Sequence, residues 1–285
     1  MSPTLQIGIK QKDDSMIKLI ASDIDGTLVP DGTAKIDKRI YDIIRRLKEH
    51  GIIFVGASGR QFASMVRLFA PVCEDIYYIT EGGTVVRDTK NVYDMHVIDR
   101  DILMEMIKDV KKLPDCDIML SGRDTAYCED KSEMFYWMRD SYRFNIEVLG
   151  DFETHLNEDV VKLSIYHKYN NVESVVNEWF TPKWEKHFKI ANAGAMWMDI
   201  VSPEVDKGTA LKVLQDKLGI SREESMVFGD NLNDLGLMEA AEESYAIGSA
   251  RDEVKAVAKH IAPPLDENGV TQVLQNFLNE LEGNK

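Results

Sequence analysis

The chain has 285 residues and a mass of 32.4 kDa, the size of one large domain or two ordinary ones. With 44% hydrophobic and 29% charged residues, its composition is that of a globular protein, which argues against a disordered or membrane-embedded chain. The formal charge of −15 argues against general nucleic-acid binding, because the phosphate backbone would be repelled. It does not exclude a small anionic substrate, since a site can be locally positive in an acidic protein.

The cysteines and the first residues indicate the compartment. Cys73, Cys116 and Cys128 are far apart and outside any CxxC pattern, which argues against a disulfide framework or a thiolate zinc site and favours a reducing compartment. Residues 1–16 lack the apolar core of a signal peptide, and no apolar run reaches the length of a membrane span. We therefore expect a cytoplasmic monomer or homodimer with no nucleic-acid or membrane partner.

In chain order, short apolar runs alternate with stretches of helical periodicity, the pattern of a parallel sheet covered on both faces. The predicted strands are Met16 to Ser22, Ile52 to Ala57, Ile76 to Thr80, Ser225 to Gly229, Ser244 to Ile247 and a short one near His260. The predicted helices are Ile36 to His50, Gln61 to Phe69, Lys207 to Leu218, Leu232 to Ala241, one from Asp252, and Val270 to Leu281. This order predicts an α/β fold with a doubly wound, mostly parallel core.

The middle of the chain has a different character. From 86 to 186 the sequence predicts a hairpin, further strands and helices in an α+β arrangement, with aromatic residues concentrated between Tyr127 and Trp184. We therefore expect a core formed by residues 1–85 and 187–285, with residues 86–186 as an inserted domain. The aromatic residues at 135–137, with Tyr142 and Phe144, either line a pocket or form the core of this insert.

The most informative segment is SDIDGTLV, Ser22 to Val29, which follows the first predicted strand. Its carboxylates therefore emerge at the carboxyl end of a parallel sheet, where ligands bind in open α/β folds. Asp23 and Asp25 are two residues apart, so on an extended chain both side chains leave the same face. Because two carboxylates this close repel each other, we expect a cation or a shared proton, and Mg²⁺ is the common hard ion with oxygen ligands.

Three further segments place polar groups at strand ends or helix starts. Ser58-Gly59-Arg60 follows the second strand, and its hydroxyl and amide groups can hold a phosphate. Lys207-Gly208 opens a helix, and GDNLND puts Asp230 and Asp234 one helical turn apart. Each segment alone fits a helix cap, a turn or a solvated lysine. Together they supply the acidic groups, the lysine and the hydrogen-bond donors that phosphoryl transfer requires.

With these motifs in this order, the sequence resembles the haloacid dehalogenase superfamily of phosphohydrolases, in particular its Cof-like members with a large α/β cap. The four matching motifs are DIDGT at Asp23 to Thr27, SGR at Ser58 to Arg60, Lys207-Gly208, and GDNLND at Gly229 to Asp234. The resemblance covers most of the chain, because the insert between Ser58 and Lys207 has the length of that family's cap. It implies a Rossmann-like core with an inserted α+β cap that determines substrate specificity.

The resemblance also implies roles for individual residues. The catalytic residues would be Asp23, Asp25, Ser58 and Lys207. Asp23 would be the nucleophile that forms an aspartyl-phosphate, and Asp25 would act first as general acid and then as general base. Lys207 would neutralise the phosphoryl group and hold Asp23. The residues that bind the substrate would be Ser58, Gly59, Lys207 and Asn233.

The metal site that the resemblance implies holds Mg²⁺ as cofactor. Its ligands would be Asp23, the main-chain carbonyl of Asp25, and Asp230, with Asp234 binding through water or supporting the other ligands. One position departs from the family pattern, because Glu81 stands where many relatives have asparagine before a glycine. We expect this loop to differ in shape and in any contact that it makes with substrate.

The resemblance therefore implies a Mg²⁺-dependent phosphatase that hydrolyses small phosphomonoesters, such as sugar phosphates or related metabolites. Two alternatives stay open at this point. A phosphomutase shares the aspartyl-phosphate chemistry and differs only in the final acceptor. A phospho-receiver or binding module would be phosphorylated at Asp23 but turn over slowly. Asp25 and Lys207 argue against such a module, because a long phosphoryl lifetime is incompatible with a well-placed acid and base.

Overall fold

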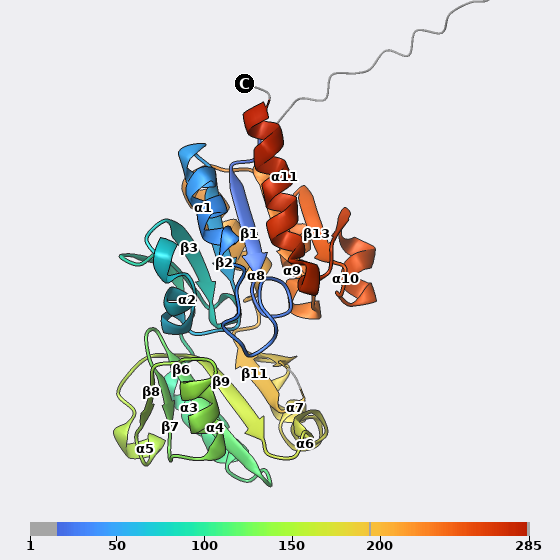
Figure 1. The fold of residues 1–285 in the computed structure, drawn as a ribbon. Coiled ribbons are helices and arrows are strands. Elements are labelled where there is room, and N and C mark those ends of the chain that lie inside the picture. Colours follow the sequence, from blue (N-terminus) through green and yellow to red (C-terminus); the bar gives the residue numbers. More distant parts are fainter. Residues whose placement is uncertain (1–15, 194, 284–285) are drawn as a thin grey trace, which may run out of the picture.

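The computed structural model describes residues 16–193 and 195–283. These residues form two lobes, each built on its own β-sheet, and the lobes lie one above the other in Figure 1. The larger lobe contains both ends of the described chain, and the smaller lobe is formed from its middle. The carboxyl end of the central strand points toward the smaller lobe (Figure 1).

The larger lobe is built on an eight-stranded sheet. Its strands, in spatial order, are β14 (His260–Ala262), β13 (Glu243–Ile247), β12 (Ser225–Gly229), β1 (Leu19–Asp23), β2 (Ile53–Ala57), β3 (Ile76–Thr80), β4 (Val85–Arg87) and β5 (Val92–Met95). The six strands from β14 to β3 are mutually parallel, whereas β4 and β5 form an antiparallel hairpin at one edge. This sheet confirms the predicted α/β fold with a mostly parallel core.

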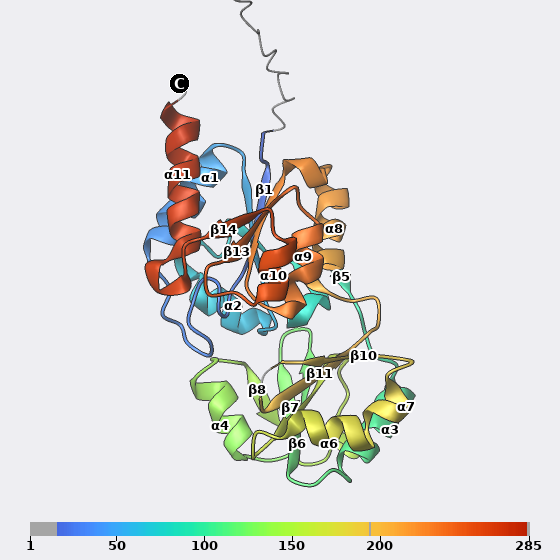
Figure 2. The same ribbon diagram turned by 90° about the vertical axis from the view of Figure 1, so that its right-hand side faces the viewer.

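Helices cover both faces of this sheet, because its central strands are apolar on both sides. Ile20 of β1 packs into a cluster with α1 (Arg39–Glu49), α2 (Phe62–Leu68) and α11 (Gly269–Gly283). Leu19 and Ala21 point to the opposite face and pack with α8 (Lys207–Leu218), α9 (Leu235–Glu239) and α10 (Asp252–Val257). Figure 2 shows these two helix layers on either side of the strands.

One predicted helix differs in detail. The segment from Leu232 begins as a 3₁₀ turn, Leu232–Asp234, and becomes α-helical only at Leu235. The side chain of Asn231 accepts a hydrogen bond from the amide of Leu232, and that of Asp234 accepts one from the amide of Asn231. These bonds satisfy amides that an ordinary first helical turn would leave free, so they tighten the start of the segment.

The smaller lobe is built on a six-stranded, mostly antiparallel sheet. Its strands, in spatial order, are β10 (Lys189–Asn192), β11 (Trp197–Val201), β9 (Val160–His167), β6 (Cys116–Gly122), β7 (Ala126–Cys128) and β8 (Ile146–Val148). One face packs on α3 (Arg100–Val110), α5 (Phe152–His155), α6 (Val172–Trp179) and α7 (Thr181–Trp184). The opposite face carries α4 (Glu133–Asp140) over part of its area.

The chain passes from one sheet to the other at positions that differ from the limits 86 and 186, which were drawn from composition. β4 pairs with β3 and β5 pairs with β4, so the first sheet continues to Met95. β11 pairs with β9 and β10 pairs with β11, so the second sheet continues to Val201. Composition does not show this, because a strand has the same apolar alternation whichever sheet it joins. The division into a catalytic core and a specificity cap stays a prediction.

None of the helices within residues 16–193 and 195–283 combines the length and the apolar character that a membrane crossing demands.

Candidate active site

A cavity of about 400 Å³ lies between the two lobes, at the carboxyl ends of β1, β2 and β12. Every residue that the sequence analysis named for the site lines this cavity except Asp234, which is fully buried beside it. The lining residues among them are Asp23, Asp25, Ser58, Gly59, Lys207, Asp230 and Asn233. Four segments that are far apart in sequence therefore meet at one edge of the sheet, as expected for an open α/β fold.

Lys207 connects two of the carboxylates. Its ammonium donates hydrogen bonds to Asp23 Oδ1 and, at 2.6 Å, to Asp234 Oδ1. Lys207 is the first residue of α8, and the side chain of Asp206 caps this helix by accepting from the amides of Gly208 and Thr209. The cap fixes where the helix begins, and hence where the lysine points.

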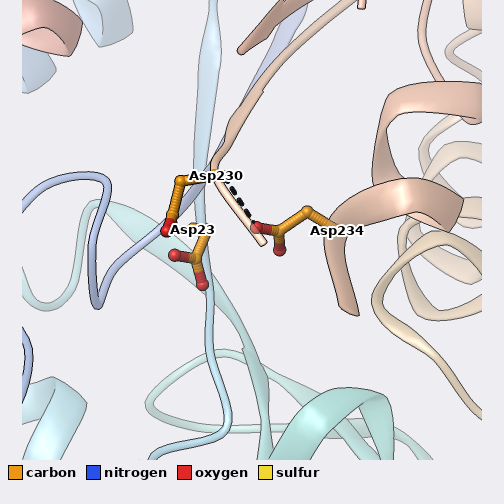
Figure 3. A group of neighbouring side chains, drawn as sticks. All are labelled: Asp23, Asp230 and Asp234. Atoms are coloured by element: carbon orange, nitrogen blue, oxygen red, sulfur yellow. Dashed lines mark hydrogen bonds between the residues drawn. The ribbon is translucent and has the colours of Figure 1, made fainter. Parts of the chain in front are cut away.

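The third carboxylate, Asp230, lies beside Asp23 at the end of β12. Ligand oxygens of Asp23, Asp230 and Asp234 all lie within 4.8 Å of one another, and Figure 3 shows these side chains gathered at the strand ends. Thr27 Oγ1 donates to Asp230 Oδ1 at 2.7 Å. Gly26 has a φ of +88°, and a Cβ there would lie 2.4 Å from Asp230 Oδ2. The turn after β1 therefore requires glycine both for its conformation and for space.

Asp25 belongs to a separate group of contacts. The guanidinium of Arg60 binds it in a bidentate manner, with Nε 2.8 Å from Oδ2 and Nη2 2.6 Å from Oδ1. The amide of Gly32 donates to Oδ1 at 3.2 Å, and the hydroxyl of Ser58 lies 3.5 Å from Oδ2. Arg60 was part of the SGR motif but was given no role from sequence. Its planar group holds Asp25 in one orientation beside Ser58.

Burial and neighbouring charges perturb the ionisable groups of this site. Burial raises the pKa of Asp23 well above its usual value, and the charge of Asp234 adds to this, whereas Lys207 opposes it. Burial disfavours the Lys207 ammonium, but the carboxylates of Asp23 and Asp234 outweigh burial and raise its pKa. Burial also raises the pKa of Asp230. The site thus concentrates negative charge that a further cation would stabilise.

The donor set fits a hard divalent cation. Asp23 and Asp230 each keep one oxygen outside the hydrogen bonds to Lys207 and Thr27, and both line the cavity. Both oxygens of Asp234 are already used, Oδ1 by Lys207 and Oδ2 by the amides of Asp230 and Asn231. Carboxylate oxygens are the ligands that Mg²⁺ prefers, so Asp23 and Asp230 are suited to bind it directly and Asp234 to support them.

The smaller lobe contributes a group that sequence reasoning missed. Lys162 of β9 forms an ion pair with Glu81, with 2.7 Å between Nζ and Oε2, and donates to the main-chain carbonyl of Gly59 at 3.1 Å. Lys162, Ser164 and Asp199 all line the cavity. The strand VVKLSIYH contained the signal, because lysine and serine alternate there with apolar residues. Polar residues at every second position of a buried strand indicate a face that is turned toward a site.

The aromatic residues of the smaller lobe divide between the two roles considered from sequence. Tyr142 and Phe144 line the cavity, together with Trp197. Phe135 packs inside the cluster under α4, so it is a core residue. Tyr136 is 45% exposed.

Comparisons with known proteins give consistent results. The family model for haloacid dehalogenase-like hydrolase matches residues 20–274. A 5-amino-6-(5-phospho-D-ribitylamino)uracil phosphatase from Escherichia coli is 27% identical over 272 residues, which cover 92% of this chain and 96% of that protein.

Two solved structures extend the comparison to the fold. A protein from Eubacterium rectale is 42% identical, with a TM-score of 0.84 over 92% of this chain and 99% of its own. A sugar phosphatase described as subclass IIB is 22% identical, with a TM-score of 0.75 over 91% of this chain and 98% of its own. At that identity, the second structure supports the fold alone.

Proposed function

Because this chain belongs to the haloacid dehalogenase-like hydrolases and is a phosphoric monoester hydrolase, we propose that it transfers the phosphoryl group of a small phosphomonoester to Asp23. The substrates would be sugar phosphates or related metabolites. The phosphatase from Escherichia coli is named for a phosphorylated ribityl compound, so a phosphorylated polyol chain is one candidate. The observation that carries the proposal is the buried Asp23 carboxylate, held by Lys207 at the wall of the cavity.

In the first step, Asp23 attacks phosphorus and the bond to the leaving oxygen breaks. Asp25 gives its proton to that oxygen, so the leaving group departs as an alcohol rather than an alkoxide. In the second step, Asp25 takes a proton from water, whose oxygen attacks phosphorus and releases Asp23 with inorganic phosphate. The bidentate Arg60 contact fixes the orientation in which the Asp25 carboxylate accepts the proton in the second step.

The remaining groups bind the phosphoryl oxygens. Lys207 supplies a positive charge beside Asp23, and Ser58, Gly59 and Asn233 supply hydrogen-bond donors on the same cavity. Mg²⁺ would be held by Asp23, Asp230 and the main-chain carbonyl of Asp25, and it would neutralise charge on the transferring phosphoryl group. Asp234 would keep Lys207 and the loop after β12 in place.

The experiment is phosphate release from a panel of metabolite phosphomonoesters and from p-nitrophenyl phosphate. We expect turnover with Mg²⁺, loss of turnover in excess chelator, and recovery when Mg²⁺ is restored. Ca²⁺ should support turnover poorly, because its larger and looser coordination misplaces the nucleophile. Isomer formation from hexose phosphates without phosphate release would indicate a phosphomutase instead. Full activity in excess chelator would contradict the proposed metal.

A further inference from the structure

One wall of the cavity contains three charged side chains that come from both lobes. Lys162 belongs to β9, Asp199 to β11, and Glu81 to the loop after β3. We call these three residues the wall trio. They do not belong to the four motifs, and Glu81 stands where the family resemblance leads one to expect asparagine.

The ammonium of Lys162 is already close to three oxygen atoms of the protein. Its ammonium lies 2.7 Å from Glu81 Oε2, 3.1 Å from the carbonyl oxygen of Gly59 and 3.4 Å from Asp199 Oδ2. Only the contact with Gly59 has the geometry of a hydrogen bond, and the contacts with the two carboxylates are ion pairs. The residue is also only 3% exposed. The positive charge of Lys162 is therefore already paired with carboxylates of the protein.

With both of its carboxyl groups ionised, the trio carries an excess of negative charge, although burial raises the pKa of Glu81 and Lys162 opposes this. Two carboxylates, Glu81 and Asp199, face the single cation of Lys162. Asp199 is the more accessible of the two, with its side chain 20% exposed, and Oδ1 accepts from the Ser164 hydroxyl at 2.6 Å. Asp199 lines the cavity, and the lone pairs of its oxygens that remain unused can accept hydrogen bonds from hydroxyl or amino groups there.

Among the described residues of this wall, the one further cation faces a carboxylate of its own. Among the described residues of the smaller lobe that line the cavity, the only other cation is Lys189. Its ammonium lies 3.6 Å from Asp206, which also lines the cavity, and 3.2 Å from the carbonyl oxygen of Val205. An anionic group placed beside the wall trio would therefore meet repulsion.

From this arrangement we infer that the wall trio selects phosphomonoesters whose leaving group is uncharged and carries hydroxyl or amino donors. Leaving groups with a carboxylate or a second phosphate are rejected. The inference rests on the proposed function, because it concerns what binds beside the transferred phosphoryl group. It assigns Glu81 and Asp199 to specificity and leaves the chemistry at Asp23 unchanged.

The test uses two competitors that differ only in one charge. Sorbitol 6-phosphate and 6-phosphogluconate have the same open chain, but one ends in CH₂OH and the other in a carboxylate. Each is added to the full-length protein with Mg²⁺ while nitrophenolate release from p-nitrophenyl phosphate is followed. We expect the inhibition constant of 6-phosphogluconate to exceed that of sorbitol 6-phosphate at least tenfold.

Two variants locate the origin of this difference. Glu81→Gln and Asp199→Asn each remove the excess charge and keep an oxygen acceptor for Lys162 or Ser164. Each should reduce the ratio of the two constants at least threefold. Asp216→Asn removes the same charge from an exposed position on α8, where the side chain is 68% exposed, and should leave the ratio unchanged.

The outcomes separate this inference from the proposed function. Absence of nitrophenolate release from the wild-type protein would contradict the proposed function itself. Release with equal inhibition by the two compounds, or with inhibition by neither, would contradict only the selection inferred here. If Glu81→Gln and Asp199→Asn both keep the wild-type ratio of the two inhibition constants, the trio is not the origin of that ratio. A ratio that falls in both wall variants and not in Asp216→Asn supports the assignment.

Discussion

Lys207 and Asp234 show how individual residues keep this acidic site stable. Two buried carboxylates and an ammonium group form one connected set, in which Lys207 contacts both Asp23 and Asp234. Removing one partner of a buried ion pair leaves an uncompensated charge, which typically costs about 3–5 kcal/mol. Lys207 therefore stabilises the fold around the site, in addition to the role proposed for it toward phosphate.

Asp230 differs from Asp234, because one of its oxygens is outside the hydrogen bond from Thr27. Asp230→Asn should raise the Mg²⁺ concentration that gives half-maximal activity by at least about tenfold, since it replaces a charged ligand by a neutral one. The measurement is a Mg²⁺ titration of p-nitrophenyl phosphate hydrolysis. Asp216→Asn is the matched control and should titrate like the wild type. An unchanged midpoint in Asp230→Asn would exclude Asp230 as a metal ligand.

For individual residues, the sequence predicted positions that depend on the neighbouring chain, and it missed contacts between side chains. Asp23, Asp25 and Ser58 follow strands directly, so their position at the sheet edge was predictable from the strand assignment. The Arg60–Asp25 pair was not predictable, because an arginine has several rotamers and nothing in the SGR motif fixes its partner. The ion pair of Lys162 with Glu81 joins residues 81 positions apart in the chain, so it depends on how the two lobes meet.

Among the elements, α8 depends most closely on its neighbour. A Cβ at Gly208 would lie 2.2 Å from the carbonyl oxygen of Gly236 in α9, so the two helices touch through their backbones. This contact and the cap by Asp206 together place Lys207 at the site. The helix itself was predicted from periodicity, but its distance from α9 was not predicted, since a single sequence contains no packing distance.

Gly208→Ala should therefore displace the start of α8. We expect a loss of about 1–3 kcal/mol in the free energy of unfolding, because the added methyl group must push a backbone away, together with a marked fall in kcat. Thermal unfolding and steady-state kinetics measure the two effects. Gly283→Ala is the control, since a Cβ at that helical position meets nothing within 4 Å. Wild-type kcat in Gly208→Ala would contradict the dependence of Lys207 on this contact.

In the molecule as a whole, the cavity exists only because the two lobes meet. Gln61, at the start of α2, donates from Nε2 to the carbonyl oxygen of Asn145 at 2.9 Å and accepts from its amide at 2.7 Å. Ser64 donates to the carbonyl oxygen of Tyr142. The segment that carries Tyr142 and Phe144 into the cavity is thus bound to the larger lobe. Sequence predicted an insert but not these contacts, because main-chain partners leave no side-chain pattern.

Gln61→Ala removes both hydrogen bonds to Asn145. If the smaller lobe covers the bound substrate, the KM for a sugar phosphate should rise about two- to tenfold, since a net hydrogen bond contributes about 0.5–1.5 kcal/mol. The KM for p-nitrophenyl phosphate, which needs fewer contacts with the smaller lobe, should change less. Gln275→Ala is the control, since this side chain in α11 donates to Asn279 of the same helix. Equal changes for both substrates would indicate that the contact is structural only.

The central claim is that Asp23 receives the phosphoryl group and that Asp25 handles protons. Protonation of the leaving oxygen typically contributes about 10²–10⁴-fold, and it matters least when the leaving group is a stable anion. Asp25→Asn should therefore still transfer the phosphoryl group from p-nitrophenyl phosphate to Asp23. The following hydrolysis should be slow, because water has lost its base.

Stopped-flow absorbance of nitrophenolate tests this claim most directly. Asp25→Asn, mixed with p-nitrophenyl phosphate and Mg²⁺, should give a burst close to one equivalent of enzyme, followed by a slow steady phase. Asp23→Asn should give neither burst nor turnover, and an alkyl phosphate should give almost no burst with Asp25→Asn in a quenched assay of the released alcohol. A burst from Asp23→Asn, or identical behaviour of Asp25→Asn toward the two leaving groups, would contradict the account.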